Sequence, residues 1–187
     1  MRKTDVTNAG FLHAIFVYDD ETGRLFWRPR PVEMFVDGVK WSATANANRW
    51  NARYAGVEAL ACINAAGYKH GTVFGVTVDA HRVVWALKTG VWPEREVDHE
   101  NGDRADNRFG NLRHVTPGEN QKNRRKPSNN KSGVIGVYEA RGKWAANIRV
   151  DSVARYLGAY DNIDAARVAR KTAEHALAFH PNHGREA

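Results

Sequence analysis

The sequence predicts an α+β protein in which groups of short strands pack on single helices. Three observations support this class: a strand–turn–strand pattern over residues 16–27, two short strands followed by a capped helix over residues 96–125, and three strands followed by one long helix over residues 133–180. Strands grouped before a helix, without regular alternation of strand and helix, are typical of α+β domains rather than of parallel sheets.

The N-terminal pattern indicates a β-hairpin followed by an irregular stretch. Residues 16–27 are predicted to form one strand, an acidic turn closed by Thr22-Gly23, and a second strand. Residues 30–48, with Pro31 near one end and Ala-Asn repeats at the other, are expected to form an irregular loop. We expect the aromatic side chains of the hairpin to pack in the fold rather than to stack on a nucleic acid.

A buried helix is predicted next, because the apolar run Val83-Val84-Trp85-Ala86-Leu87 follows His81 and Arg82. Two interpretations of His81 are open: a packed, hydrogen-bonded position or a contact with a phosphate. Arg82 is a second candidate for such a contact.

Two strands and a helix are predicted after that. Glu96-Val97-Asp98 indicates a short strand that ends at the acid, Asn101 to Gly110 a long turn, and Leu112 to Val115 a returning strand. The helix that follows has a clear start, because Thr-Pro-Gly-Glu at residues 116–119 supplies an N-cap, a proline at the first helical position and the acid of a capping box. Asn120 then falls in this helix.

Polar residues of this segment stand in the order Asp98-His99, Asn111, Asn120. An Asp-His pair in a turn is usually a solvated surface pair, so only the joint spacing carries information. That spacing resembles the HNH endonucleases, in the phage and intron-homing branch whose last motif position is Asn. Four flanking motifs also occur in the family's order and spacing: His81-Arg82-Val83-Val84-Trp85, Asn107-Arg108, Asn111-Leu112-Arg113 and Glu119-Asn120.

The resemblance extends over most of residues 11–125, because the hairpin word Tyr18-Asp19…Thr22-Gly23 also occurs in the phage group. It implies a ββα-metal core, in which two strands and a helix meet at one metal ion. It also implies a structural role for Asn111, whose side chain would brace the loop and orient His99.

The chemistry of phosphodiester hydrolysis explains why these residue types are needed. The reaction requires a nucleophilic water, charge neutralisation on the scissile phosphate, and help for the departing 3′ oxygen. His99 suits the role of general base, because a neutral imidazole accepts a proton near neutral pH. Asp98 and Asn120 suit the role of ligands to a hard cation, for which oxygen donors are preferred. Such a ligand set favours Mg²⁺ or Mn²⁺ over Zn²⁺.

Arg113 and His114 are weaker candidates for contacting the scissile phosphate, since strand alternation directs only one of them toward the site. After the helix, residues 122–126 form a basic run and residues 127–132 a polar linker. Arg124 and Arg125 of the basic run are candidate DNA contacts. The domain organisation is therefore expected to be a nuclease region at 1–126 with its motif core at 79–125, a linker at 127–132, and a second domain at 133–187.

The second domain is predicted to be a small three-stranded antiparallel sheet packed on one helix. Strands are expected at 135–139, 143–150 and 155–159, and the helix at 162–179. In the middle strand, one face carries Trp144, Ala146, Ile148 and Val150 and can pack on the helix, while the other face carries Lys143, Ala145, Asn147 and Arg149.

This domain resembles the ethylene-response-factor (APETALA-type) DNA-binding domain in the words Gly136-Val137, residues 142–149, Leu157-Gly158-x-Tyr160 and Ala165-Ala166. The resemblance implies that the exposed sheet face enters the major groove. Candidate DNA contacts are then Tyr138, Arg141, Lys143, Asn147, Arg149 and Tyr156. The plant proteins carry arginines where this chain has Tyr138 and Ala140, so base specificity does not transfer. A polar face that merely meets water is the alternative.

Composition agrees with a polyanionic partner, because the 187 residues carry a formal net charge of +7. The single cysteine, Cys62, excludes a disulfide framework within one chain and a cysteine-based zinc cluster. No apolar run has the length of a membrane span, and the N-terminus lacks the apolar segment of a signal peptide. We expect a cytoplasmic protein of a bacterial host cell, encoded by a phage or mobile element.

The sequence thus predicts a metal-dependent endonuclease, of homing or phage type, that cuts double-stranded DNA. Two alternatives stay open. One is a sequence-specific DNA-binding regulator that has lost catalysis, and the other is a nuclease that acts on RNA or single strands.

Overall fold

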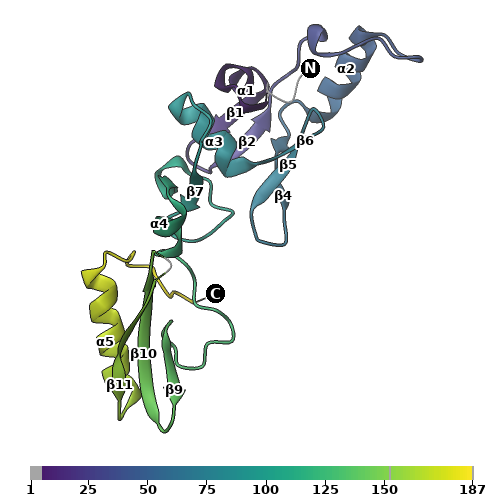
Figure 1. The fold of residues 1–187 in the computed structure, drawn as a ribbon. Helices are drawn as coiled ribbons and strands as arrows, with labels where there is room; N and C mark the ends of the chain where they lie inside the picture. Colours follow the sequence, from purple (N-terminus) through teal and green to yellow (C-terminus); the bar gives the residue numbers. More distant parts are fainter. Residues whose placement is uncertain (1–5, 152, 187) are drawn as a thin grey trace. The chain divides into compact units, whose positions relative to one another are not determined.

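The computed structural model describes residues 6–151 and 153–186 and has an α+β architecture, as predicted (Figure 1). The chain divides into two compact units. The first comprises the described residues up to His99 together with Asp103–His114, and the second comprises Glu100–Gly102 together with the described residues from Val115 onward. The functional boundary expected between residues 126 and 133 stays a prediction.

The first unit is built from short strands and three α-helices within its described part. Its elements in chain order are α1 (Ala9–Ile15), β1 (Phe16–Asp19), β2 (Arg24–Trp27), a 3-10 turn (Val32–Met34), α2 (Ala43–Tyr54), β3 (Glu58–Ala59), β4 (Cys62–Ile63), β5 (Lys69–Val73), β6 (Val76–Asp79), α3 (Ala80–Thr89), β7 (Glu96–His99), a second 3-10 turn (Phe109–Asn111) and β8 (Leu112–Val115). The sheets have the orders β1-β2-β3, β4-β5-β6 and β7-β8.

The predicted N-terminal hairpin is confirmed, since β1 and β2 pair antiparallel from Phe16 opposite Trp27 to Asp19 opposite Arg24. The side chain of Asp19 organises the turn by accepting hydrogen bonds from the Glu21 amide at 3.0 Å and the Thr22 hydroxyl at 2.6 Å. Such side-chain to backbone bonds are the reason that Asp favours turns.

The expectation of an irregular loop over residues 30–48 was wrong in its second half, where α2 begins at Ala43. The Ser42 hydroxyl caps this helix by accepting from the Ala45 amide, and alanine has the strongest helix propensity. The helix is fixed to the hairpin through Arg30, whose guanidinium lies 3.9 Å from the ring centre of Trp50. The Arg30 backbone also exchanges two hydrogen bonds with the Asn51 side chain.

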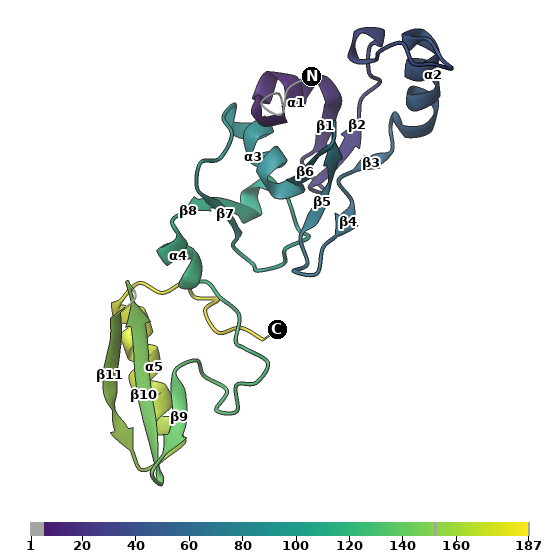
Figure 2. The same ribbon diagram turned by 45° about the vertical axis from the view of Figure 1, so that its right-hand side comes forward.

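The core of the first unit lies where α1 and α3 meet the strands (Figure 2). The prediction of a buried helix after His81 is confirmed: Val83, Val84 and Ala86 of α3 are completely buried, as are Leu12 and Ile15 of α1. Gly90 ends α3 in the left-handed conformation that glycine adopts without strain. This core holds the strand β7, which carries the candidate catalytic histidine.

The second unit contains α4 (Pro117–Gln121), β9 (Val137–Ala140), β10 (Lys143–Val150), β11 (Val153–Tyr160) and α5 (Ile163–Ala176). The capping box of α4 is confirmed, with the Glu119 carboxylate accepting from the Thr116 amide at 2.7 Å and the Thr116 hydroxyl accepting from the Glu119 amide. The strand order is β11-β10-β9, and α5 covers one face of this sheet (Figure 2). The predicted sheet backed by one helix is therefore observed, with element ends shifted by up to three residues.

Sheet registers confirm the predicted faces of β10. Trp144 and Ala146 pack with Ala166 of α5, whereas Tyr138 lies opposite Ala145 and Tyr156 opposite Asn147 on the other face. β9 pairs only with residues 143–146 of β10, so it ends well before β10 does. Within the described residues, no helix is long and apolar enough to span a membrane.

Candidate active site

His99 is the last residue of β7 and is almost completely buried, with 1% of its surface exposed. Strand alternation places Val97 and His99 on the core side of β7, while Asp98 lies on the opposite side and is half-buried. The Nε2 atom of His99 lies 2.9 Å from the Oδ1 atom of Asn107, which is also 1% exposed. A buried hydrogen bond of this length fixes the orientation of the ring.

The partner of Nε2 determines the tautomer of His99. Because a carbonyl oxygen can only accept, the proton lies on Nε2 and the lone pair lies on Nδ1. Burial lowers the pKa of His99, and the Asn107 contact and nearby acids oppose this shift only in part. The imidazole is therefore neutral at pH 7, which is the state that a general base requires.

Two aromatic rings pack around His99. The His81 ring centre lies 5.3 Å away and the Tyr68 ring centre 5.8 Å away. His81 is only 6% exposed, and burial lowers its pKa to about 3. Of the two interpretations of His81, the geometry favours packing over a phosphate contact.

The Arg82 side chain has structural contacts. Its guanidinium donates to the backbone carbonyls of Pro93 and Arg95 at 2.5 and 3.1 Å, which ties α3 to the segment before β7. A phosphate contact by Arg82 would have to replace these hydrogen bonds.

Asp98 is paired with Arg113 of the neighbouring strand β8. One carboxylate oxygen accepts from Arg113 Nε at 3.0 Å and from a terminal nitrogen at 2.7 Å. His114 points away from Asp98, because its Nε2 accepts from the Arg95 amide and its ring packs on Trp85. Alternation thus brings only one residue of this pair to Asp98, as expected, and that residue is Arg113.

The loop between β7 and β8 carries Asn107 and is braced at several points. The Asn111 side chain donates to the carbonyl of Asp106 at 2.8 Å, so Asn111 holds the loop next to the residue that contacts His99. Arg104 reaches from the same loop to the carbonyl of Ala66 at 2.7 Å. Asn111 therefore supports the loop, while Asn107 makes the bond to the imidazole.

The N-terminal hairpin also supports this loop, a role that the sequence interpretation missed. The Tyr18 hydroxyl donates to the carbonyl of Asn107 at 3.1 Å and accepts from the Phe109 amide at 2.9 Å. Gly23 lies against the same backbone with φ +70°, and a Cβ there would lie 2.4 Å from the Arg108 nitrogen. The signal was present, because Tyr18, Gly23 and Asn107 all belong to the quoted motif words, but spacing alone does not show contact.

Asn120 lies on the short helix α4 of the second unit, whereas Asp98 and His99 belong to the first. A carboxylate and an amide oxygen suit a hard divalent cation, which completes its shell with water and phosphate oxygens. Among the described residues, no three His, Cys, Asp or Glu side chains gather in a group that could hold a metal ion.

Candidate DNA contacts of the second unit lie mainly on the sheet face opposite α5. Tyr138 and Tyr156 are 46% and 66% exposed, although such rings usually pack. Arg141 lies at the β9–β10 turn with positive φ, and Lys143 pairs with Asp161 at 2.9 Å. Arg125 donates to the carbonyl of Gly102, so its guanidinium is used within the unit.

Comparison with known proteins gives one match. Residues 78–122, which run from β6 to the end of α4, match the HNH endonuclease family. This segment contains His99, Asn107 and Asn111 with their neighbours. No curated protein and no solved structure matches the chain.

Removing the Tyr18 hydroxyl tests the support that the hairpin gives to the loop. Tyr18→Phe should lower the free energy of unfolding by roughly 1–3 kcal/mol, because the partly buried Phe109 amide and the Asn107 carbonyl lose their partner. Urea unfolding of the full chain measures this. Tyr54→Phe is the matched control in the same unit and should change stability by less than about 0.5 kcal/mol. Equal losses in both variants would contradict the bracing role.

Proposed function

We propose that this chain is a metal-dependent DNA endonuclease of the homing or phage type, acting in the cytoplasm of a bacterial host. The observation that carries the proposal is the burial and orientation of the His99 imidazole. It is a buried, neutral imidazole, oriented by Asn107, within the segment that matches the HNH endonuclease family. Burial of this kind costs stability unless the polar groups are satisfied, which favours a functional reason for the histidine.

In the proposed reaction, His99 Nδ1 accepts a proton from the attacking water. Asn107 keeps the imidazole in the required tautomer and stabilises the imidazolium that forms, because Oδ1 continues to accept from Nε2. Tyr18 and Asn111 act as positioning residues, since they hold the loop on which Asn107 lies. Each of these contacts lies within the first unit.

Asp98 and Asn120 would hold the divalent cation, which supplies charge neutralisation on the scissile phosphate and the leaving oxygen when bound. Arg113 would then share the Asp98 carboxylate with the cation. Its pairing at 2.7 Å keeps the buried side of that carboxylate compensated and oriented.

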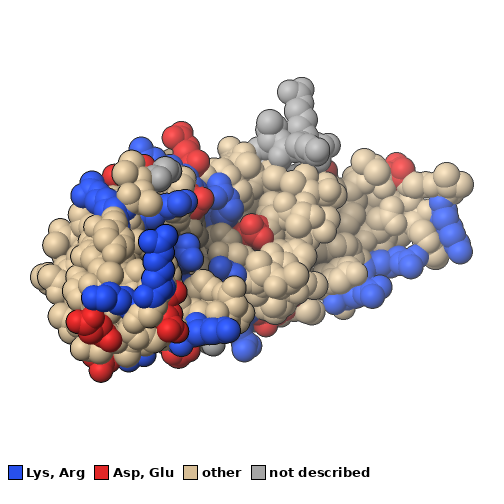
Figure 3. Space-filling view, turned by 60° about the horizontal axis from the view of Figure 1, so that its bottom comes forward, with Lys and Arg blue, Asp and Glu red and all other residues tan. Residues whose placement is uncertain are grey.

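Double-stranded DNA is the proposed substrate, and the second unit is the proposed source of most binding. The net charge of +7 favours a polyanion. Lys and Arg side chains are spread over the face of the second unit seen at the left of Figure 3, with acidic side chains between them. Asn147, which lies opposite the exposed Tyr156 on β11, has the kind of amide group that pairs with adenine in the major groove.

The two alternatives are separated by simple assays. A regulator without catalysis would bind duplex DNA but leave a supercoiled plasmid intact in Mg²⁺. A nuclease for RNA or single strands would degrade those substrates at least about tenfold faster than duplex DNA of the same sequence, a difference of about 1.4 kcal/mol in transition-state binding.

Replacing the base tests the proposal most simply. His99→Ala should lower plasmid cleavage by about 10²–10⁴-fold, because this is the usual contribution of general-base catalysis. Duplex binding should change little. His13→Ala, an exposed histidine of α1, is the control and should keep full activity. If His99→Ala weakened binding and cleavage equally, the assignment would fail.

Metal dependence is the next test. EDTA should stop cleavage by the wild type, and added Mg²⁺ should restore it. Asp98→Asn and Asn120→Ala should lower the rate by roughly a hundredfold or more at any Mg²⁺ concentration, because the cation supplies several kcal/mol of charge stabilisation. Asp98→Asn keeps an acceptor for Arg113, so its unfolding free energy separates a structural loss from a loss of metal binding. Cleavage that persists in EDTA would rule out the metal.

Sequence preference should depend on the sheet face. Asn147→Ala should reduce the preference for the mapped cleavage site over unrelated duplex by about 1–3 kcal/mol, the usual value of one bidentate base contact. Binding to unrelated duplex should be nearly unchanged. Asn129→Ala, an exposed linker residue, is the control. Unaltered preference in Asn147→Ala would remove this residue from the base-reading set.

A further inference from the structure

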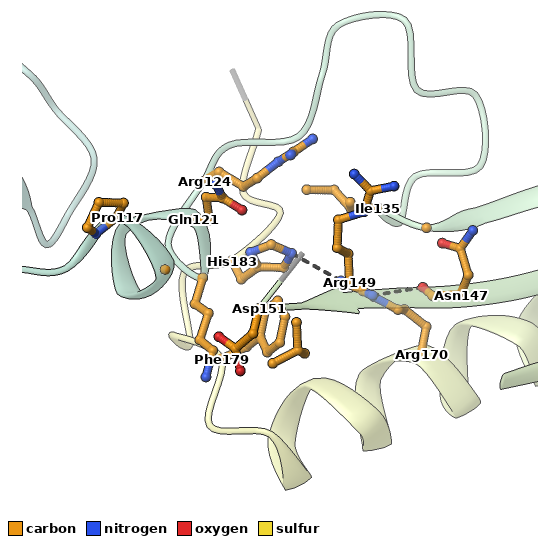
Figure 4. A pocket seen from close by; sticks show the side chains of 14 residues that line it. Pro117, Gln121, Arg124, Ile135, Asn147, Arg149, Asp151, Arg170, Phe179 and His183 are labelled. Carbon is orange, nitrogen blue, oxygen red and sulfur yellow. Dashed lines mark hydrogen bonds between the residues drawn. The ribbon is translucent and has the colours of Figure 1, made fainter. Parts of the chain in front are cut away.

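A cavity of about 460 Å³ lies within the second unit, beside the part of β10 that β9 does not cover (Figure 4). β9 begins at Val137, opposite Ala146, so the edge of β10 from Asn147 onward is not paired with β9. The Asn147 carbonyl accepts from Arg170 of α5 at 2.8 Å, and the Asn147 amide donates to Gly136 at 2.8 Å. The cavity is bounded by this edge, by α4 with the basic run that follows it, and by the segment after α5.

Cationic side chains dominate the lining of this cavity. Four of them line it, against one carboxylate: Lys122, Arg124, Arg149 and Arg170, with Asp151. Two of the four cations have partners within the unit. Arg170 pairs with the buried carboxylate of Glu174 at 2.9 Å, and Lys122 donates to the Leu177 carbonyl at 2.9 Å.

Arg124 and Arg149 differ from these two. Both are exposed, and within the described part of the chain neither guanidinium has a hydrogen-bond or ion-pair partner. Figure 4 shows that they start from opposite walls, Arg124 from the basic run after α4 and Arg149 from β10, and extend toward the same region beside Ile135. Two cations that converge without a counter-ion repel one another, so the arrangement favours an anion between them.

A buried histidine, His183, belongs to the wall of the same cavity. His183 is 5% exposed, and its Nε2 lies 3.3 Å from a terminal nitrogen of Arg170. Arginine can only donate, so Nε2 accepts and the proton lies on Nδ1. Within the described residues Nδ1 has no hydrogen-bond partner although it is buried. Burial also lowers the pKa of His183 to about 4, so the ring is neutral at pH 7 and adds no charge to the cavity wall.

We propose that this cavity is a binding site for a phosphate group, held between the guanidinium groups of Arg124 and Arg149. The chemistry distinguishes a phosphate from a carboxylate. One arginine fork uses both oxygens of a carboxylate, whereas a phosphate has enough oxygens to accept from two forks approaching from opposite walls. The geometry therefore makes Arg149 a phosphate contact rather than a base-reading residue.

The phosphate group has two chemical sources, the backbone of a nucleic acid and a free phosphate or nucleotide. The first source deepens the proposed function, and in that case the inference rests on it, because the cavity would then hold a phosphate of the DNA backbone. Binding is measured without cleavage, so a failure of catalysis and a failure of this site give different results.

The test uses the full chain and three single variants. Arg124→Gln and Arg149→Gln remove one guanidinium each, and both positions are exposed, so folding should be retained. Arg155→Gln on β11 is the matched control, because it removes the same charge from an exposed position outside the cavity. The first readout is the amide NMR signals of Gly136, Arg149 and His183 during a titration with inorganic phosphate, with chloride at equal ionic strength as the reference.

The second readout is the affinity for a DNA duplex across a salt series. We expect phosphate, and not chloride, to shift the cavity signals of the wild type and of Arg155→Gln. Its affinity should fall roughly tenfold or more in Arg124→Gln and in Arg149→Gln, since each loses charge-assisted hydrogen bonds. If the phosphate belongs to DNA, the logarithmic salt slope of these two variants should also decrease by about 0.9.

An altered phosphate affinity with an unchanged salt slope supports the site and assigns it to a free phosphate or nucleotide. An altered slope alone supports it as a contact with the DNA backbone. The proposal is overturned if phosphate and chloride act alike on the wild type and the slopes of all three variants agree. It is overturned equally if Arg155→Gln loses as much as the two cavity variants.

Discussion

The hydrogen bond between His99 and Asn107 is the interaction on which the candidate site depends. An imidazole that is 1% exposed has no water to set its tautomer, so the protein must provide the partner that does. Asn107 can act only if its loop is held, and the contacts from Tyr18, Gly23, Asn111 and Arg104 converge on that loop. These contacts hold the loop in place, so that Asn107 fixes one tautomer of His99.

The strands and helices around the motif were predictable because their signals are local. Alternation in β10, the capping box before α4 and the apolar run of α3 each lie within a few residues, and each was found in the structure. The start of α2 was missed because Ala-Asn repeats suggest a loop until Ser42 is seen as a cap. In this segment alanine favours a helix and asparagine favours a turn, and the hydrogen bond from the Ala45 amide to the Ser42 hydroxyl starts the helix.

The site was harder to predict, because its contacts join residues far apart in the chain. The spacing predicts His99 and Asp98 as site residues but does not show that Tyr18 contacts the backbone of Asn107 or that Asp98 is paired with Arg113. In the second unit, likewise, the pattern gave the faces of β10 but not the early end of β9. The cavity with Arg124 and Arg149 lies beside the part of β10 that β9 does not cover.

The central claim is that His99 is neutral at pH 7 and carries its proton on Nε2, which leaves Nδ1 to act as the base. Long-range ¹H–¹⁵N NMR spectra of the histidine rings measure this directly, with a His99→Gln spectrum to assign the signals. The account predicts one protonated nitrogen, Nε2, and an Nδ1 signal typical of an unprotonated ring nitrogen. A ring protonated on Nδ1, or an imidazolium at pH 7, would contradict it.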